Sequence, residues 1–194
     1  MNEIAITKPV TRRFPAKTRA ALVEAARQEF EEVGFEETNT NRIAKRAGFA
    51  PQTFYRHFPD KIAIFLAVYE RWADEELKAV TDAENATEAA DIVIRDHRAS
   101  LKFRRALRSL TLTNPLIREA RARSRLAQLA ALRQRFARLA ACDPAHLAFS
   151  LLTIERLADA HVEGELHDLG IPEAASRAEL VRQLANELGI PLTG

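Results

Sequence analysis

Five polar side chains that could read DNA bases follow Pro51 in quick succession: Gln52, Thr53, Tyr55, Arg56 and His57. In the major groove, glutamine can form two hydrogen bonds with adenine, and arginine can form two with guanine. Assigning Phe54 and Phe58 to the core leaves the polar side chains on the exposed side of one short helix. The spacing therefore predicts a helix that contacts DNA, with Gln52 and Arg56 setting the choice of sequence.

A helix of this kind must be held by two others, and the preceding sequence supplies both. The apolar stripe of residues 16–33 predicts a first helix, which Gly34 would end. A second, short helix is expected after the capping side chains of residues 38–40, and Gly48 allows the tight turn that follows it. Pro51 suits the first turn of the third helix, because its missing N–H would have no helical partner there.

The run IAKRAGFAPQTFYRHFPDK, from Ile43 to Lys61, resembles the DNA-binding domain of tetracycline-repressor-like (TetR) regulators. The resemblance extends over about residues 17–69, with Ile-Ala, Ala-Gly, Phe-Tyr and Phe-Pro-x-Lys elements at the family's spacing. It implies phosphate contacts at the start of the second and fourth helices, and backbone contacts from the third. The implied DNA-contacting set is Thr40, Asn41, Pro51, Gln52, Thr53, Tyr55, Arg56, His57 and Lys61.

Two positions depart from the pattern of that family. Ala50 stands where the family often has a capping serine, so the third helix lacks a side-chain cap worth about 1 kcal/mol. Gln52 occupies a position where many members carry a small residue. This makes Gln52 a candidate for reading a base and leaves the operator sequence open.

The composition favours an all-α protein of two parts without a membrane span. The chain has 194 residues, 47% of them hydrophobic, a net charge of +2 and one cysteine, Cys142. No window approaches the roughly 18 apolar residues of a spanning helix, and a single cysteine fits a reducing cytoplasm. We expect a flexible basic arm (residues 1–15), a helix-turn-helix domain (16–61) and a helical effector-binding and dimerisation domain (62–194).

The second part is predicted to begin with a long helix and to continue with helices only. Asp60 can cap a fourth helix of about twenty residues, which would span roughly 30 Å and link the two parts. A polar stretch at residues 81–87 would end it. Proline and polar turns then divide the remainder into helices near residues 87–114, breaking near Leu101, and near 115–141, 144–169 and 172–188.

An arginine stripe after Pro115 permits two interpretations. In a continuous helix, Arg118, Arg121 and Arg125 share a face with Leu129 and Leu132, so the guanidinium groups would need partners. One interpretation is an anionic effector, such as a carboxylate, bound in a pocket between helices; the other, which we favour, is pairing with the acidic helices of the chain. Residues 95–138 hold 13 Lys or Arg and 2 Asp or Glu, whereas residues 139–194 hold 3 and 9. The candidate effector-binding residues are His97, Phe103, Arg118, Arg121, Arg125, Phe136 and Phe149.

The last two long helices are candidates for a dimer interface. By the TetR resemblance they would form a four-helix bundle across a two-fold axis, and two recognition helices would read two half-sites of a pseudo-palindrome. The candidate residues are Leu147, Leu151, Ile154, His161, Val181, Leu184 and Leu188. His161 and Glu165 have ligand spacing, but two ligands do not make a metal site, and no cofactor is expected.

Together these features predict a cytoplasmic, homodimeric transcriptional regulator that binds double-stranded operator DNA, in the form of a repressor released by a small molecule. A ligand that binds the two states unequally would change the separation of the recognition helices through the fourth helix. One alternative is a DNA-binding dimer without an effector, controlled by a protein partner or acting architecturally. A second alternative is an all-α enzyme, although no nucleophile, metal set or phosphate loop supports catalysis. Effector, operator, regulated genes and the choice between repression and activation stay open.

Overall fold

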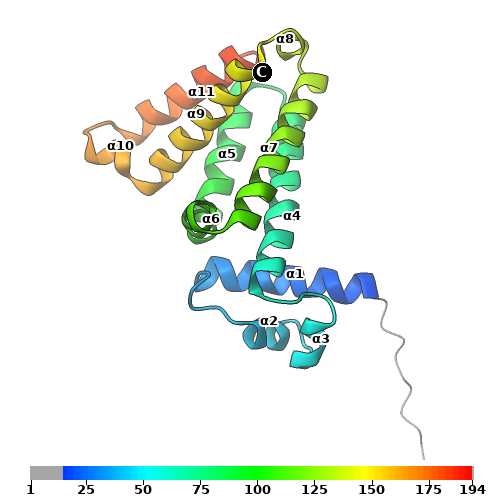
Figure 1. The fold of residues 1–194 in the computed structure, drawn as a ribbon. Helices are drawn as coiled ribbons and strands as arrows, with labels where there is room; N and C mark the ends of the chain where they lie inside the picture. The colour runs from blue at the N-terminus through cyan, green and yellow to red at the C-terminus, as the bar shows by residue number, and fades with distance from the viewer. Residues whose placement is uncertain (1–14, 194) are drawn as a thin grey trace, which may run out of the picture.

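The computed structural model describes residues 15–193, which form eleven helices and no strand, as the periodicity predicted. The expected basic arm lies, except for Pro15, outside these residues. Figure 1 shows a small domain of three helices below and a larger helical domain above, with one long helix running between them. No helix within residues 15–193 is long and apolar enough to cross a membrane.

The small domain contains α1 (Pro15–Glu32), α2 (Thr40–Arg46) and α3 (Pro51–Tyr55). Asn39 caps α2 by accepting a hydrogen bond from the Arg42 N–H at 3.0 Å. Gly48 forms the turn with φ +75°, a conformation that side chains with a Cβ rarely adopt. Ala50 gives α3 no side-chain cap, and Pro51 begins it, as expected. The helix ends earlier than predicted, at Tyr55, and a turn carries the chain on to Pro59.

The long helix α4 (Lys61–Asp82) is capped by Asp60, whose carboxylate accepts from the Ala63 N–H at 2.8 Å. Its first turns pack against α1, and its later turns lie beside α5 and α7. In Figure 1 it is the element that leads from the small domain into the larger one.

The larger domain differs from the predicted helices at two breaks. The expected helix of residues 115–141 is interrupted at Phe136, which adopts an extended conformation and turns its ring into the core. The expected helix of residues 144–169 ends before Gly164, whose φ is +85°. The helices are α5 (Ala86–Ala99), α6 (Leu101–Thr113), α7 (Pro115–Arg135), α8 (Ala137–Ala140), α9 (Pro144–Glu163), α10 (Glu165–Asp168) and α11 (Glu173–Leu188).

Two hydrophobic cores hold the chain together, and the first crosses the predicted boundary after residue 61. It joins side chains of α1 to α4 with Phe103 and Leu107 of α6 and Ile117 of α7. The Phe103 ring lies 4.5 Å from the Phe65 ring, measured between centroids. The second core lies among α5, α7, α8, α9 and α11. The larger domain therefore contributes side chains to the core of the helix-turn-helix domain.

Candidate nucleic-acid interface and ligand cavity

A buried carboxylate fixes α2 against α1. Glu29 of α1 accepts hydrogen bonds from Arg42 Nε at 2.8 Å and from Arg46 Nε at 2.7 Å, and Arg46 also pairs with Glu32. Burial alone would raise the pKa of Glu29, but the bonds from the two guanidinium groups outweigh it and the pKa lies below its ordinary value. A charged Glu29 between two arginines thus sets the angle of α2, which in turn carries α3.

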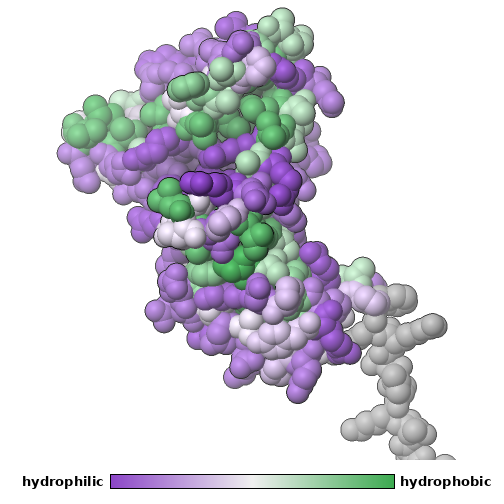
Figure 2. Space-filling model, viewed as in Figure 1, coloured by the Kyte–Doolittle hydropathy of each residue, from purple (hydrophilic) through white to green (hydrophobic). Residues whose placement is uncertain are grey.

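Helix α3 presents Gln52 and Tyr55 to solvent, and Arg56, the residue directly after the helix, is exposed as well, as predicted. The Tyr55 side chain is 56% exposed, and its hydroxyl lies 2.9 Å from Thr40 Oγ1 at the start of α2. Asn41 and Pro51 are also exposed, and His57 is partly buried. Figure 2 shows this end of the molecule covered mainly by hydrophilic residues, whereas hydrophobic residues gather over the larger domain. The arrangement offers hydrogen-bonding side chains on a narrow surface.

Two residues predicted to contact DNA, Thr53 and Lys61, form hydrogen bonds within the chain. Thr53 was expected on the exposed side of α3, but it is buried, and its Oγ1 accepts a hydrogen bond from Arg56 Nη2 at 3.0 Å. Thr53 and Phe54 are the buried residues of α3, so Thr53 holds Arg56 rather than facing solvent. Lys61 Nζ donates to the Phe35 carbonyl at 2.7 Å and to the Thr38 carbonyl at 3.0 Å. Since an ammonium has three donors, one N–H of Lys61 is left beyond these bonds.

The larger domain contains a buried cluster of charges centred on Asp159 of α9. Asp159 Oδ1 lies 2.9 Å from His97 Nδ1 and accepts from Arg104 Nε at 3.0 Å, while Oδ2 accepts from Arg108. Burial opposes the charged carboxylate, yet the hydrogen bond from His97 and the charge of Arg104 keep its pKa well below the ordinary value. Burial also lowers the pKa of His97. The carboxylate therefore serves three partners from two helices.

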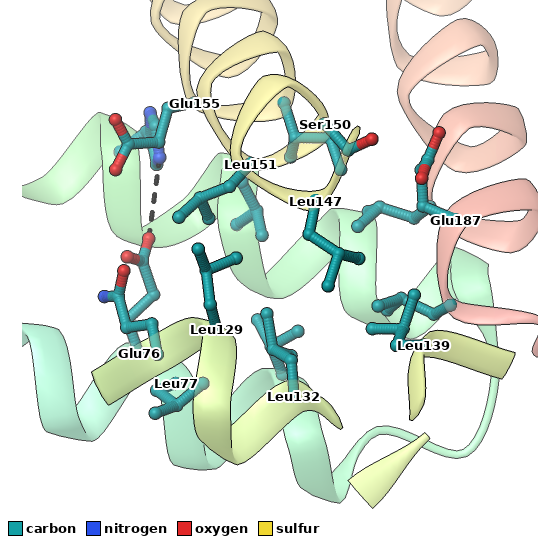
Figure 3. Close-up of a pocket in the computed structure, with 17 residues that line it drawn as sticks. Glu76, Leu77, Leu129, Leu132, Leu139, Leu147, Ser150, Leu151, Glu155 and Glu187 are labelled. Carbon is teal, nitrogen blue, oxygen red and sulfur yellow. Dashed lines mark ion pairs between the residues drawn. The ribbon is translucent and has the colours of Figure 1, made fainter. Parts of the chain in front are cut away.

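Beside this cluster, a cavity of about 100 Å³ lies between α4, α5, α7, α8, α9 and α11. Its centre is apolar, with leucines such as Leu129, Leu132 and Leu151 pointing toward one another (Figure 3). Glu76 and Glu155 lie at one end, and Glu187 lies toward the other. Among the described residues the lining includes His97 and Gln128 but neither lysine nor arginine.

Most of the predicted effector-binding residues lie away from this cavity. Only His97 lines it. Phe103 and Phe136 are buried in the two cores, whereas Arg118 and Phe149 face solvent, with Phe149 74% exposed. Helical spacing alone could not distinguish the inner from the outer position of these aromatic rings, because both faces of their helices carry apolar residues.

The arginine stripe pairs within the chain, as the favoured interpretation predicted. Arg121 Nη2 lies 3.3 Å from Glu155 Oε2, and Arg125 donates to the same oxygen. Arg118 takes no part because it is exposed. The partner residues were missed in the sequence, although Glu155, Asp159 and Glu163 are spaced four residues apart along one face of a helix.

The residues predicted for a dimer interface belong to the interior of one chain. Their side chains hold α9 and α11 onto the rest of the domain: Leu147, Val181, Leu184 and Leu188 are buried, Leu151 and Ile154 line the cavity, and His161 Nδ1 lies 2.7 Å from Ser176 Oγ. Within one chain these side chains contact their own domain, and their contact with a second copy stays a prediction. In residues 15–193, no group of three His, Cys, Asp or Glu side chains could hold a metal ion.

Comparison with known proteins matches residues 22–68 to the bacterial regulatory proteins of the tetR family. Residues 22–68 therefore form a DNA-binding domain of this family. Its curated relatives include the HTH-type transcriptional activator FasR of Mycolicibacterium smegmatis, 33% identical over 69 residues (36% of this chain, 32% of FasR). An HTH-type regulator of Staphylococcus aureus is 38% identical over 63 residues, or 32% of this chain and 34% of the relative. The match thus spans about a third of the length of these relatives.

Solved structures extend the likeness from this domain to the larger one, at the level of the fold. A TetR-family regulator from Rhodococcus sp. has a TM-score of 0.68 at 18% identity, covering 89% of this chain and 99% of its own. A regulator from Saccharomonospora viridis, solved in complex with choline, has a TM-score of 0.60 at 17% identity, covering 90% of this chain and 96% of its own.

Proposed function

We propose that the chain is a sequence-specific DNA-binding transcriptional regulator of the cytoplasm, acting as a homodimeric repressor released by a small molecule. The observation that carries the proposal is the set of exposed side chains on α3, in a domain that matches the tetR family. Gln52 and Arg56 would read bases, and Thr40, Asn41, Pro51, Tyr55, His57 and Lys61 would contact the backbone. Thr53 would act indirectly, by holding Arg56.

The cavity beside the second core supports control by a ligand rather than a DNA-binding dimer without an effector. It lies between α4 and the helices of the larger domain, so a ligand there would contact the helix that leads to the DNA-binding domain. A ligand that prefers one arrangement of α4 would shift the spacing of two recognition helices. Choline is bound by the Saccharomonospora viridis regulator, whose fold is similar.

The test of DNA recognition is a selection of bound fragments followed by fluorescence anisotropy at fixed salt. Replacing Gln52 or Arg56 with alanine should weaken binding to the selected sequence by about 1–3 kcal/mol for each half-site and relax its sequence preference. Binding to random DNA should change less, because non-specific binding depends on phosphate contacts. Arg98→Ala, an exposed arginine on α5, serves as the control and should leave DNA affinity unchanged.

Equal affinity for selected and random DNA would contradict the proposal. Transcription of a reporter from the selected sequence then distinguishes repression from activation, a relevant choice because the relative FasR is described as an activator.

We place the contact with a second copy of the chain on the outer face of α9. Phe149 and Leu152 are 74% and 45% exposed there, while the opposite face of α9 is packed against its own domain. Two half-sites one helical turn apart require two copies, and large exposed apolar side chains mark protein contacts. Phe149→Asp should turn a dimer into a monomer in sedimentation velocity, whereas Leu112→Asp on α6 should not. A wild-type monomer, or a dimeric Phe149→Asp variant, would exclude this interface.

A further inference from the structure

Glu76 lies at one end of the cavity with its side chain 15% exposed, and its Oε1 is buried without a hydrogen bond. Its Oε1 is 3.5 Å from His97 Nε2 and 3.7 Å from Arg104 Nη1, both longer than an ordinary hydrogen bond. No hydrogen bond joins the Glu76 carboxylate to any residue within 15–193, and Gln128 Oε1, on the same lining, is also buried without a partner. Unpaired buried acceptors of this kind are rare and call for an explanation.

The cavity lining excludes the anionic effector that the arginine stripe suggested. Arg121 and Arg125 are turned to Glu155. Arg104 donates from Nε to Asp159 and its guanidinium lies 4.6 Å from the Trp72 ring centroid, while its Nη1, also without a hydrogen bond, lies 3.7 Å from Glu76. None of these arginines lines the cavity. A carboxylate ligand would instead meet Glu155, and also Glu76 wherever the pH ionises it, and both carboxylates would repel a ligand of the same charge.

We infer that the cavity binds a small primary amine, with its ammonium on Glu76 and its hydrocarbon body among the leucines. This inference rests on the proposed role of the cavity as the effector site. An ammonium supplies the N–H donors that Glu76 and the Gln128 carbonyl lack, and Leu129, Leu132 and Leu151 cover an apolar chain. A cavity of about 100 Å³ is smaller than the roughly 150 Å³ cavity that holds benzene, so about six heavy atoms are the upper limit for the whole ligand. A quaternary ammonium fits less well because it has no N–H.

Protonation of Glu76 gives the inference a pH dependence. Burial raises the pKa of Glu76 to about 7, against the opposing charge of Arg104. The ammonium binds the ionised carboxylate, so amine affinity should fall as the pH drops below about 7, by up to about tenfold per unit. The charged and titratable groups around Glu76 are Asp96 and His97 of α5, Arg104 of α6, and Glu155 and Asp159 of α9, with Arg121 and Arg125 of α7 behind Glu155.

The test is calorimetric titration of the whole chain, without DNA, with pentylamine, pentanol, pentanoate and ethyltrimethylammonium. Pentylamine should bind at least about tenfold more tightly than the other three, because only it pairs a charge and donates hydrogen bonds. Glu76→Gln should reduce pentylamine affinity by at least about tenfold, whereas Glu179→Gln, a carboxylate on α11 outside the cavity, should leave it unchanged. If Glu76→Gln fails to fold, the pH dependence of pentylamine affinity in the wild type tests the role of the Glu76 carboxylate instead.

Equal or tighter binding of pentanoate or pentanol, or an unchanged Glu76→Gln variant, would overturn the inference. So would the absence of pentylamine binding.

A separate experiment tests ligand control: the anisotropy measurement with the selected operator is repeated in the presence of each compound. If pentanoate releases DNA and pentylamine does not bind, the amine inference fails while ligand control stands. If pentylamine binds and DNA affinity stays the same, the amine inference stands while ligand control fails.

Discussion

Replacing Asp159 with alanine is expected to lower the free energy of unfolding by about 3–5 kcal/mol, because it leaves buried cations without their partner. Arg104 is almost fully buried, and Asp159 accepts its Nε hydrogen bond at 3.0 Å. Arg108 and His97 lose the same carboxylate. The measurement is urea unfolding at neutral pH, followed by far-UV circular dichroism.

An exposed ion pair provides the matched control for Asp159. Asp82 pairs with Lys78 on α4, and their side chains are 62% and 77% exposed. Asp82→Ala should cost less than about 1 kcal/mol, because water screens such pairs. A loss of similar size in both variants would mean that the buried cluster contributes no more than a surface pair.

Acid should weaken the Asp159 contribution in the wild type. The pKa of Asp159 is lowered in the folded state, so its contribution is present above the unfolded value near 3.8 and is lost as the pH falls through the folded pKa below it. The difference in stability between wild type and Asp159→Asn should therefore be constant near neutrality and should shrink only in acid below about pH 4.

The sequence was sufficient for the helix-turn-helix domain because its signals are local. Asn39, Gly48, Pro51 and Asp60 each act within a few residues, on a cap, a turn or a first helical turn, and the structure has all four in the predicted roles. Phe136 shows the opposite case. Neither glycine nor proline marks the break in the helix there, because the cause is the burial of its ring among residues distant in sequence.

The interior of the larger domain could not be derived from local patterns, since it depends on which helices face one another. Glu76 lies one helical turn after Trp72 on α4, but nothing in its spacing revealed that His97 and Arg104 would surround it. The arginines were found as a stripe and their pairing was favoured, yet the common partner Glu155 comes from thirty or more residues away. A cavity forms where side chains from different helices leave the space between them unfilled, and local sequence patterns do not predict where this happens.

The Phe103 ring is expected to stabilise the whole helix-turn-helix domain from outside it. It is 2% exposed, and its centroid lies 4.5 Å from that of Phe65, 6.2 Å from that of Phe30 and 6.3 Å from that of Trp72. Phe103→Ala should lower the free energy of unfolding by about 3–5 kcal/mol, through lost burial and the cavity left behind. Leu112→Ala, on the same helix and 78% exposed, should stay within about 0.5 kcal/mol of wild type.

Hydrogen exchange locates this effect, because the ring closes a core made mostly by α1 and α4. In Phe103→Ala, the amides of α1 and of the first half of α4 should lose protection, whereas those of α9 and α11, in the second core, should keep theirs. Loss confined to α6 would mean that the small domain is stable without it. A ring from α6 that closes the DNA-binding core also makes α6 a second route, besides α4, by which ligand binding in the larger domain could reach α1 and the helices that it carries.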